Sequence, residues 1–245
     1  MKENKDFKNF IAATSQLGED FLLTQGAGGN TSFKSGEYLF IKASGLKLKD
    51  AGRKNIFVKV NFKKIVENIN LKKSNPMDNT WDLSKKLKPS IETTMHSIMP
   101  QKYVFHLHCL NTISLVVQKN FKEELNKKFK NLNFSVIDYA MPGEPLTKTI
   151  LDNFERFSPD VLFLSNHGLV VGSNNLHDAL MKIDYISKVI NKNESKKINF
   201  KSNQLIKYSS NSLYRPIKSN EANIIAYSNE FIKFATSGVL FPDQA

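Results

Sequence analysis

One short stretch of the sequence constrains the fold more than any other, because it joins a buried strand to two histidines. Residues 103–108 read Tyr-Val-Phe-His-Leu-His, with aromatic and β-branched side chains at the start. Side chains alternate between the faces of a strand, so His106 and His108 share one face and Leu107 points to the other. Both imidazoles can then bind one cation, each at about 2.0–2.1 Å. A pair of packed core histidines is the alternative, and the spacing favours the metal site.

A second apolar stretch supplies a candidate for the third metal ligand. Residues 159–165 read Pro-Asp-Val-Leu-Phe-Leu-Ser and predict a strand that runs directly into Asn-His-Gly. The histidine of that triplet, His167, would lie where loops gather over the edge of a sheet, which is a usual place for ligands. A locally hydrogen-bonded turn residue is the alternative. Three neutral imidazoles with an open fourth position are typical of a catalytic zinc site. Cys109 would point away from the pair, so we interpret it as a small buried hydrophobic residue.

A candidate acid/base lies just before the histidine strand. Residues 89–96 read Pro-Ser-Ile-Glu-Thr-Thr-Met-His and predict the start of a helix, with Ser90 as the N-cap. Glu92 would lie in the first turn and share a helix face with His96. An acidic residue there can serve the helix dipole alone. Because the helix leads directly into residues 103–108, we expect Glu92 near the histidines, where a carboxylate can transfer protons.

Two glycine-containing turns are candidates for binding an anion. Residues 26–32 read Gly-Ala-Gly-Gly-Asn-Thr-Ser and predict an irregular loop with exposed backbone N–H groups. A second turn, Ser44-Gly45, follows a predicted strand and has Lys42 beside it. Neither sequence matches a Walker loop or the dinucleotide fingerprint, and ordinary turns are the alternative.

The remaining pattern predicts one domain over residues 1–245, in which 191–245 form a C-terminal extension. Residues 71–88 are polar and predict a mobile loop, and the stretch from 192 to 218 is also polar and poorly patterned. Apolar periodicity predicts the other elements. Helices are expected at 7–17, 62–69, 111–118, 121–129, 146–157, 176–191 and 222–236, and further strands at 36–43, 56–61, 134–138 and 169–172.

Composition narrows the class of protein. One cysteine among 245 residues excludes an internal disulfide, and no apolar run is long enough for a signal segment or a membrane span. We therefore expect a cytoplasmic protein without a membrane partner. The net charge of +12 comes from scattered lysines, with only three arginines, Arg53, Arg156 and Arg215. Nucleic-acid surfaces favour arginine, so we expect a lysine-coated surface without a nucleic-acid partner.

Five ordered motifs, at residues 28–32, 41–45, 90–92, 106–108 and 165–168, resemble the class II aldolase/adducin family over about residues 5–190. The resemblance is closest to its rhamnulose-phosphate aldolase-like branch. It implies an α/β fold with three α/β/α layers and a largely antiparallel central sheet, assembled as a homotetramer with sites between subunits. It also implies residue roles. One zinc ion per subunit would bind His106, His108 and His167, Glu92 would be catalytic, and Gly29, Asn30, Ser44, Gly45 and Ser90 would hold the substrate phosphate.

The resemblance implies a zinc-dependent lyase that cleaves a phosphorylated ketose into a dihydroxyacetone-type ketone and an aldehyde. One departure concerns the phosphate, because the family's Ser-Ser-Glu reads Ser90-Ile91-Glu92 here. An epimerase or dehydratase on the same fold is one alternative, although epimerases of the family carry Asp in place of Glu92. A non-catalytic, adducin-like binding module is another, although such relatives lose the metal histidines. Residues 237–244 resemble a segment that continues further in longer relatives.

Overall fold

The computed structural model describes residues 5–154, 159–191, 206–207 and 209–211. The chain divides into two compact units, residues 1–192 and 193–245, and the helices and strands named below all lie in the first. The helix predicted at 222–236 falls outside the described residues, as does most of the predicted C-terminal extension. Within the described residues, no helix is both long enough and apolar enough to span a membrane.

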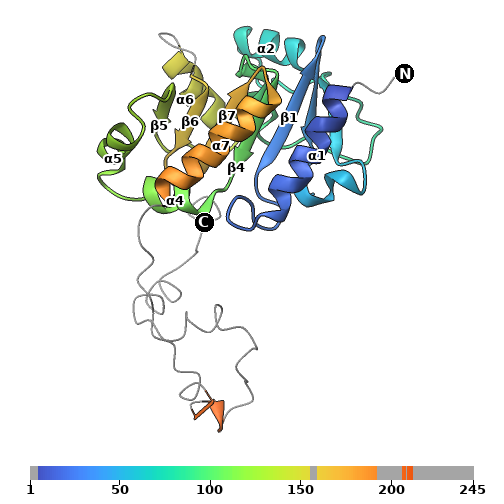
Figure 1. Cartoon of the computed structure of the whole chain (residues 1–245). Helices are drawn as coiled ribbons and strands as arrows, with labels where there is room; N and C mark the ends of the chain where they lie inside the picture. The colour runs from blue at the N-terminus through green and yellow to red at the C-terminus, as the bar shows by residue number, and fades with distance from the viewer. Residues whose placement is uncertain (1–4, 155–158, 192–205, 208, 212–245) are drawn as a thin grey trace. The chain divides into compact units, whose positions relative to one another are not determined.

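A seven-stranded sheet forms the centre of the first unit (Figure 1). The strand order is β3-β2-β1-β4-β7-β6-β5, and only the β5–β6 pair is parallel. The prediction of a largely antiparallel sheet is therefore confirmed. Strand bounds are β1 (Asn30–Ser35), β2 (Tyr38–Lys42), β3 (Phe57–Asn61), β4 (Tyr103–Leu107), β5 (Phe134–Ile137), β6 (Val161–Leu164) and β7 (Gly168–Ser173).

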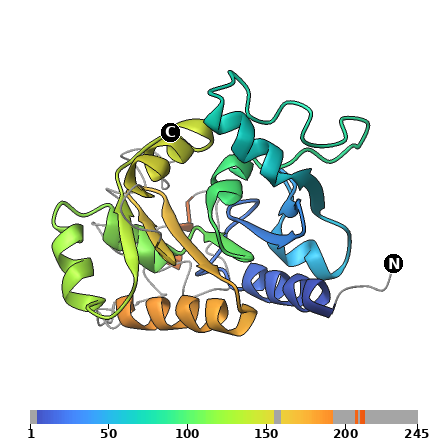
Figure 2. The ribbon, with the colours of Figure 1, turned by 90° about the horizontal axis from the view of Figure 1, so that it is seen from above.

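Helices cover both faces of this sheet, which gives the three layers that were predicted. Two long helices, α1 (Lys5–Glu19) and α7 (Leu176–Ile190), lie side by side along one face (Figure 2). The opposite face carries α2 (Phe62–Asn70), α3 (Thr93–Ile98) and α6 (Glu144–Phe154). The remaining elements are a 3₁₀ helix, η1 (Leu48–Gly52), and the short helices α4 (Leu110–Val116) and α5 (Phe121–Lys128).

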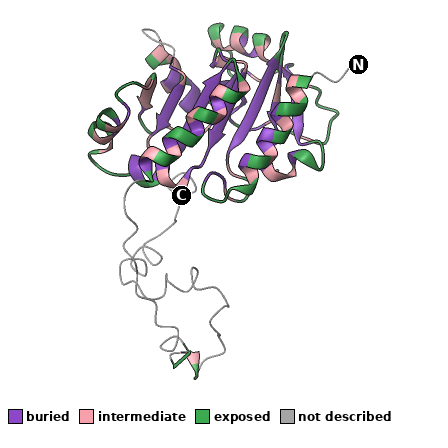
Figure 3. Ribbon diagram, in the orientation of Figure 1, coloured by how far each residue is buried: buried purple, intermediate pink, exposed green. Residues whose placement is uncertain are grey.

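The alternation along β4 decides which layer each of its side chains enters. Phe105 packs into a cluster with Phe10 of α1 and Ile183 of α7. Val104 enters a separate cluster with Met95 of α3. Both faces of the sheet are buried (Figure 3), and each fully buried large side chain stabilises the fold by about 1.5–3 kcal/mol. His106 is two residues beyond Val104, so it lies on the α3 face.

Two predictions about local structure are wrong. Residues 30–32 belong to β1 instead of an irregular turn, because their polar side chains have buried partners: the Thr31 hydroxyl lies 2.9 Å from that of Thr14. Helix α3 begins at Thr93, so Ser90 lies before the N-cap, which is Glu92. The strand preceding Ser44 ends at Lys42, close to the predicted limit.

Candidate metal and acid/base site

Sheet pairing brings the three predicted histidine ligands to one edge of the sheet. His106 is in β4 and His108 is the first residue after this strand, while His167 lies in the loop that joins β6 to β7. This loop is tight because Leu164 pairs with Gly168, and Asn166 turns the chain with a φ of 55°. Leu107 of β4 in turn pairs with Leu169 of β7, so the loop lies beside the end of β4.

The three imidazoles form a compact, buried cluster. Each can offer a nitrogen such that all three nitrogens lie within 4.8 Å of one another. Their ring centroids are 4.7–5.2 Å apart, and none of the side chains is more than 9% exposed. Residues that the sequence separates by about sixty positions therefore meet as a potential ligand set, which fits the three-nitrogen donor set of a catalytic zinc-type site.

The electrostatics of the cluster favour neutral imidazoles at His106 and His167. Burial and the neighbouring histidines lower the pKa of His167 to about 3, and burial holds the pKa of His106 well below its usual value. His106 Nδ1 donates to the Leu169 carbonyl at 3.2 Å, which fixes the tautomer and leaves a lone pair on Nε2. That nitrogen makes no hydrogen bond within the described part of the chain. A buried acceptor of this kind fits a metal ligand.

The structure places Glu92 against this cluster. Its side chain is 4% exposed, and Oε2 accepts a 2.6 Å hydrogen bond from Asn30 Nδ2. Oε2 lies 3.3 Å from His106 Nε2, and Oε1 lies 3.7 Å from His167 Nε2. The carboxylate forms no capping hydrogen bond to the described backbone of α3. Its position is therefore set by the imidazoles and Asn30, and the helix-dipole alternative has no hydrogen bond to support it.

Glycines allow the backbone to approach the histidines closely. A Cβ on Gly28 would lie 2.9 Å from His108 Nδ1, and one on Gly29 would lie 2.8 Å from the His106 carbonyl oxygen. Gly29 also has a φ of +69°, and a Cβ on Gly168 would lie 2.6 Å from the Leu107 carbonyl. Close packing around the ligands accounts for these glycines without an anion.

The residues predicted to bind phosphate are partly brought together. Ala43 and Pro89 form a β-bridge and Ser44 N donates to the Lys88 carbonyl, so Ser44-Gly45 lies beside Ser90. Ser44 and Gly45 are exposed, whereas Ser90 is buried and its Oγ accepts from Glu92 N at 3.3 Å.

Asn30 and Lys42 are already engaged by other groups. Both ends of the Asn30 amide have partners, in Glu92 and His96. Lys42 Nζ donates to the carbonyls of Ala27 and Leu46, each at 2.7 Å, so it ties the two glycine-containing turns together. Burial lowers the pKa of Lys42 to about 8 although the charge of Glu92 acts in the opposite direction.

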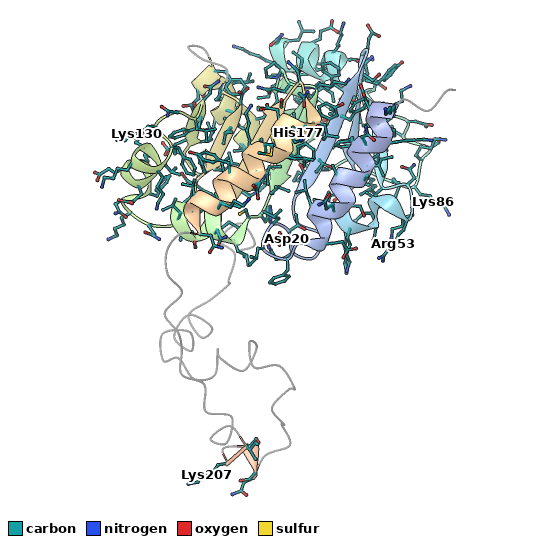
Figure 4. All side chains as sticks on the ribbon, in the orientation of Figure 1. Asp20, Arg53, Lys86, Lys130, His177 and Lys207 are labelled. Carbon is teal, nitrogen blue, oxygen red and sulfur yellow. The ribbon has the colours of Figure 1, made fainter. Side chains whose placement is uncertain are left out.

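His96 lies next to the site, and its hydrogen-bond partners could not be predicted from the sequence. We expected His96 to share a helix face with Glu92. In the structure its ring is hydrogen-bonded to Ser32 and Asn30. The signal was the alternation of polar residues at Asn30, Ser32 and Lys34, which places them on one strand face. Cys109 is fully buried, as predicted, and His177 is exposed on α7 (Figure 4).

A cavity of about 540 Å³ opens beside Ser90. Ile91 contributes to its wall with a side chain that is 69% exposed. The Ile91 side chain also lies against Gly143, whose added Cβ would come within 3.1 Å of it. The position where the sequence departs from the expected Ser-Ser-Glu therefore faces open space next to the predicted phosphate residues.

Comparison with known sequences finds one family that matches most of the chain. The family described as "Class II Aldolase and Adducin N-terminal domain" matches residues 9–191. A curated relative from Bacillus subtilis (strain 168), "Uncharacterized oxidoreductase YuxG", is 26% identical over 182 residues. That match covers 68% of this chain and 26% of the relative, so the chain spans about a quarter of the relative's length.

Solved structures share the fold. The N-terminal class II aldolase domain of a conserved protein from Thermoplasma acidophilum is 22% identical with a TM-score of 0.66, and the match covers 78% of this chain and 94% of that one. A sugar-phosphate aldolase from Thermotoga maritima is 16% identical with a TM-score of 0.56, covering 76% of this chain and 93% of that one. A structure titled L-fuculose 1-phosphate aldolase is 17% identical with a TM-score of 0.55, covering 91% and 97%.

Proposed function

This chain belongs to the family of class II aldolase and adducin N-terminal domains, and from that premise we propose that it is a metal-dependent carbon–carbon lyase. The reaction is the reversible aldol cleavage of a ketose to a dihydroxyacetone-type ketone and an aldehyde. The observation that carries the proposal is the position of the Glu92 carboxylate, within 3.3–3.7 Å of two of the three clustered imidazoles.

The donor set fits a divalent metal, and we propose zinc, one per subunit, held by His106, His108 and His167. The imidazoles are buried, and the tautomer of His106 is fixed by the Leu169 carbonyl. A metal bound there would polarise the ketone and hydroxyl oxygens of the substrate and stabilise the negative charge that develops on them.

Glu92 carries the proton in this proposal. In the condensation direction its carboxylate takes the proton from the carbon next to the ketone, and the freed electron pair forms the new bond to the aldehyde carbon. The π pair of the aldehyde C=O moves to its oxygen, which takes a proton from water and becomes the product hydroxyl. In the cleavage direction the hydroxyl that becomes the aldehyde oxygen loses its proton to water, the carbon–carbon bond breaks, and Glu92 returns a proton to the carbon next to the ketone. Asn30 holds Oε2, whereas Oε1 accepts no hydrogen bond within the described residues, so Oε1 is the atom we assign to proton transfer.

The substrate class follows from the turns beside Glu92. We propose a phosphorylated ketose whose anionic group is held by Gly29, Asn30, Ser44, Gly45 and Ser90. The names of two solved relatives, a sugar-phosphate aldolase and L-fuculose 1-phosphate aldolase, support this class. A homotetramer in the cytoplasm completes the proposal.

Exchange of the ketone's α-proton with deuterated water tests the role of Glu92 separately from bond formation. Dihydroxyacetone phosphate and dihydroxyacetone are incubated with the zinc-loaded protein, and deuterium uptake is followed by NMR. Glu92→Gln should slow exchange by roughly 10²–10⁴-fold while zinc content stays unchanged. A wild-type exchange rate in the metal-loaded variant would remove Glu92 from the mechanism.

Metal content and products separate the proposal from its two alternatives. Elemental analysis should find about one zinc per chain in the wild type and much less in His106→Ala and His108→Ala. Equal content in all three proteins would exclude this site and leave a binding module. An active protein that converts one ketose phosphate into another without releasing an aldehyde would be an epimerase.

A further inference from the structure

A chain of four buried polar side chains leads from the core to Glu92. The Ser32 hydroxyl lies 2.7 Å from His96 Nδ1, and His96 Nε2 is hydrogen-bonded to Asn30 Oδ1. Asn30 Nδ2 then donates to Glu92 Oε2 at 2.6 Å. None of the four residues is more than 4% exposed, so water does not compete for these bonds.

The direction of every bond in this polar chain follows from the carboxylate. An ionised Glu92 only accepts, so Asn30 must turn its NH₂ group toward it and its carbonyl oxygen toward His96. That oxygen only accepts as well, so His96 must carry its proton on Nε2. Its Nδ1 is then an acceptor, and the Ser32 hydroxyl donates to it. Burial lowers the pKa of His96 well below its usual value, which agrees with a ring that carries one proton.

The position of Asn30 depends on this bond. Asn30 lies in β1 directly opposite His106 of β4, so its backbone is fixed by the sheet while its amide can still rotate. Without a donor at the His96 Nε2 position, the amide could turn its oxygen toward Glu92. Two acceptors would then face each other in a buried site, which is unfavourable.

We propose that His96 is a positioning residue that, through the orientation of the Asn30 amide, holds Glu92 in the geometry for proton transfer. The inference deepens the proposed lyase function and depends on it for its catalytic consequence. The ring nitrogens of His96 are hydrogen-bonded to Ser32 and Asn30, and of these two only Asn30 contacts Glu92, so His96 acts through Asn30. Loss of its Nε2 donor should therefore lower turnover and leave the affinity for zinc unchanged.

Two amide substitutions separate the donor from the bulk of the ring. His96→Gln can place an N–H near the former Nε2 position, whereas the shorter His96→Asn can reach only the Nδ1 position. We expect His96→Gln to keep kcat for deuterium exchange within about fivefold, and His96→Asn to lose roughly 10–100-fold with little change in KM. Ser97→Ala is the matched control, since it removes a buried hydrogen bond to Thr93 in the same helix and should leave kcat unchanged. Equal kcat values for the Gln and Asn variants would overturn the proposal.

A second measurement needs no turnover. Long-range ¹H–¹⁵N correlation spectra of the zinc-loaded wild type report which nitrogen of His96 carries the proton. The Nε2–H tautomer is expected, and an Nδ1–H tautomer would overturn the proposal even in an active enzyme. If the protein binds zinc but catalyses no exchange, the lyase function fails while the tautomer still decides the hydrogen-bond chain. If His96→Asn does not fold, the tautomer remains decisive.

Discussion

Single residues decide whether the three imidazoles can meet, and several of them are positions without room for a Cβ. A Cβ added at Gly28, Gly29 or Gly168 would lie within 3 Å of a histidine ring nitrogen or of a carbonyl oxygen of β4. Asn166 contributes differently, because it holds the left-handed conformation that the loop carrying His167 requires. Both effects can be tested separately from chemistry.

Gly28→Ala should weaken zinc binding roughly tenfold or more, because the new methyl group displaces the ring of His108. Competition with a chromophoric chelator measures the affinity. Gly52→Ala is the control, since Gly52 lies in η1, away from the site, and its Cβ would lie 3.3 Å from the hydroxyl of Ser15 in α1. Equal zinc affinities for the Gly28 and Gly52 variants would contradict this packing role.

Asn166→Ala should lower the free energy of unfolding by about 1 kcal/mol, because alanine is disfavoured in the left-handed region. Asn166→Gly should leave it nearly unchanged. Urea denaturation gives both values. Asn79 also has a positive φ, of 56°, in the loop 71–88, so Asn79→Ala should cost a similar amount of stability without affecting zinc. A zinc affinity that falls equally in both alanine variants would contradict the link between Asn166 and His167.

The residues of the site could be predicted to different degrees. His106 and His108 follow from strand alternation, which is a local rule that two residues are enough to apply. The contact between Asn30 and Glu92 depends instead on the antiparallel register of β1 with β4, and this register cannot be predicted from the local sequence. His96 could be placed on the helix face of Glu92, but its partners come from β1, a strand that its turn-like composition concealed.

At the scale of elements, helices with a clear apolar period were predicted within a few residues, and the errors lie where polar side chains are buried. Helix α3 shows why. It is six residues long, and Lys34 reaches from β1 to the carbonyl groups of Met99 and Gln101 at its C-terminal end. A pattern of apolar residues does not predict that a lysine is buried in a strand. Lys34 nevertheless connects β1 with the end of α3, the two elements that lie on either side of Glu92.

Burial lowers the pKa of Lys34 from 10.5 to about 7. Between these two values the unfolded chain binds a proton that the folded chain does not, so the free energy of unfolding should rise with pH. Lys34→Met removes this contribution, and the stability difference, wild type minus variant, should grow by up to about 1.4 kcal/mol per pH unit. Urea denaturation at pH 7, 8 and 9 measures it. A difference independent of pH would mean that Lys34 keeps its proton in the fold.

At the scale of the whole molecule, the sheet collects the site from distant parts of the chain. Residues 28–32, 90–108 and 164–169 meet because β1, β4 and β7 are neighbours in the sheet order. The resemblance predicted this layered architecture and its mostly antiparallel sheet, and the structure confirms both. That residues 1–245 form a single domain remains a prediction. The site lies in the compact unit of residues 1–192.

A fragment of residues 1–192 should fold and bind zinc by itself, because, among the residues that the structure describes, the clusters of buried apolar side chains all lie within it. Its thermal midpoint should agree with that of the full chain within about 4 °C, the shift that about 1 kcal/mol produces in a domain of this size. Circular dichroism measures the midpoint. A fragment without a cooperative transition would show that residues 193–245 are part of the same folding unit.

The buried position of Cys109 makes the reactivity of its thiol a measure of local opening next to His108. This residue, the chain's single cysteine, directly follows His108, is fully buried, and has its sulfur 3.9 Å from the Ser187 hydroxyl of α7. A thiol reagent can reach this buried sulfur only while the structure around it opens. The rate of thiol modification under native conditions therefore reports how often the segment next to the ligand His108 opens, and a bound metal should slow modification in proportion to the opening it prevents.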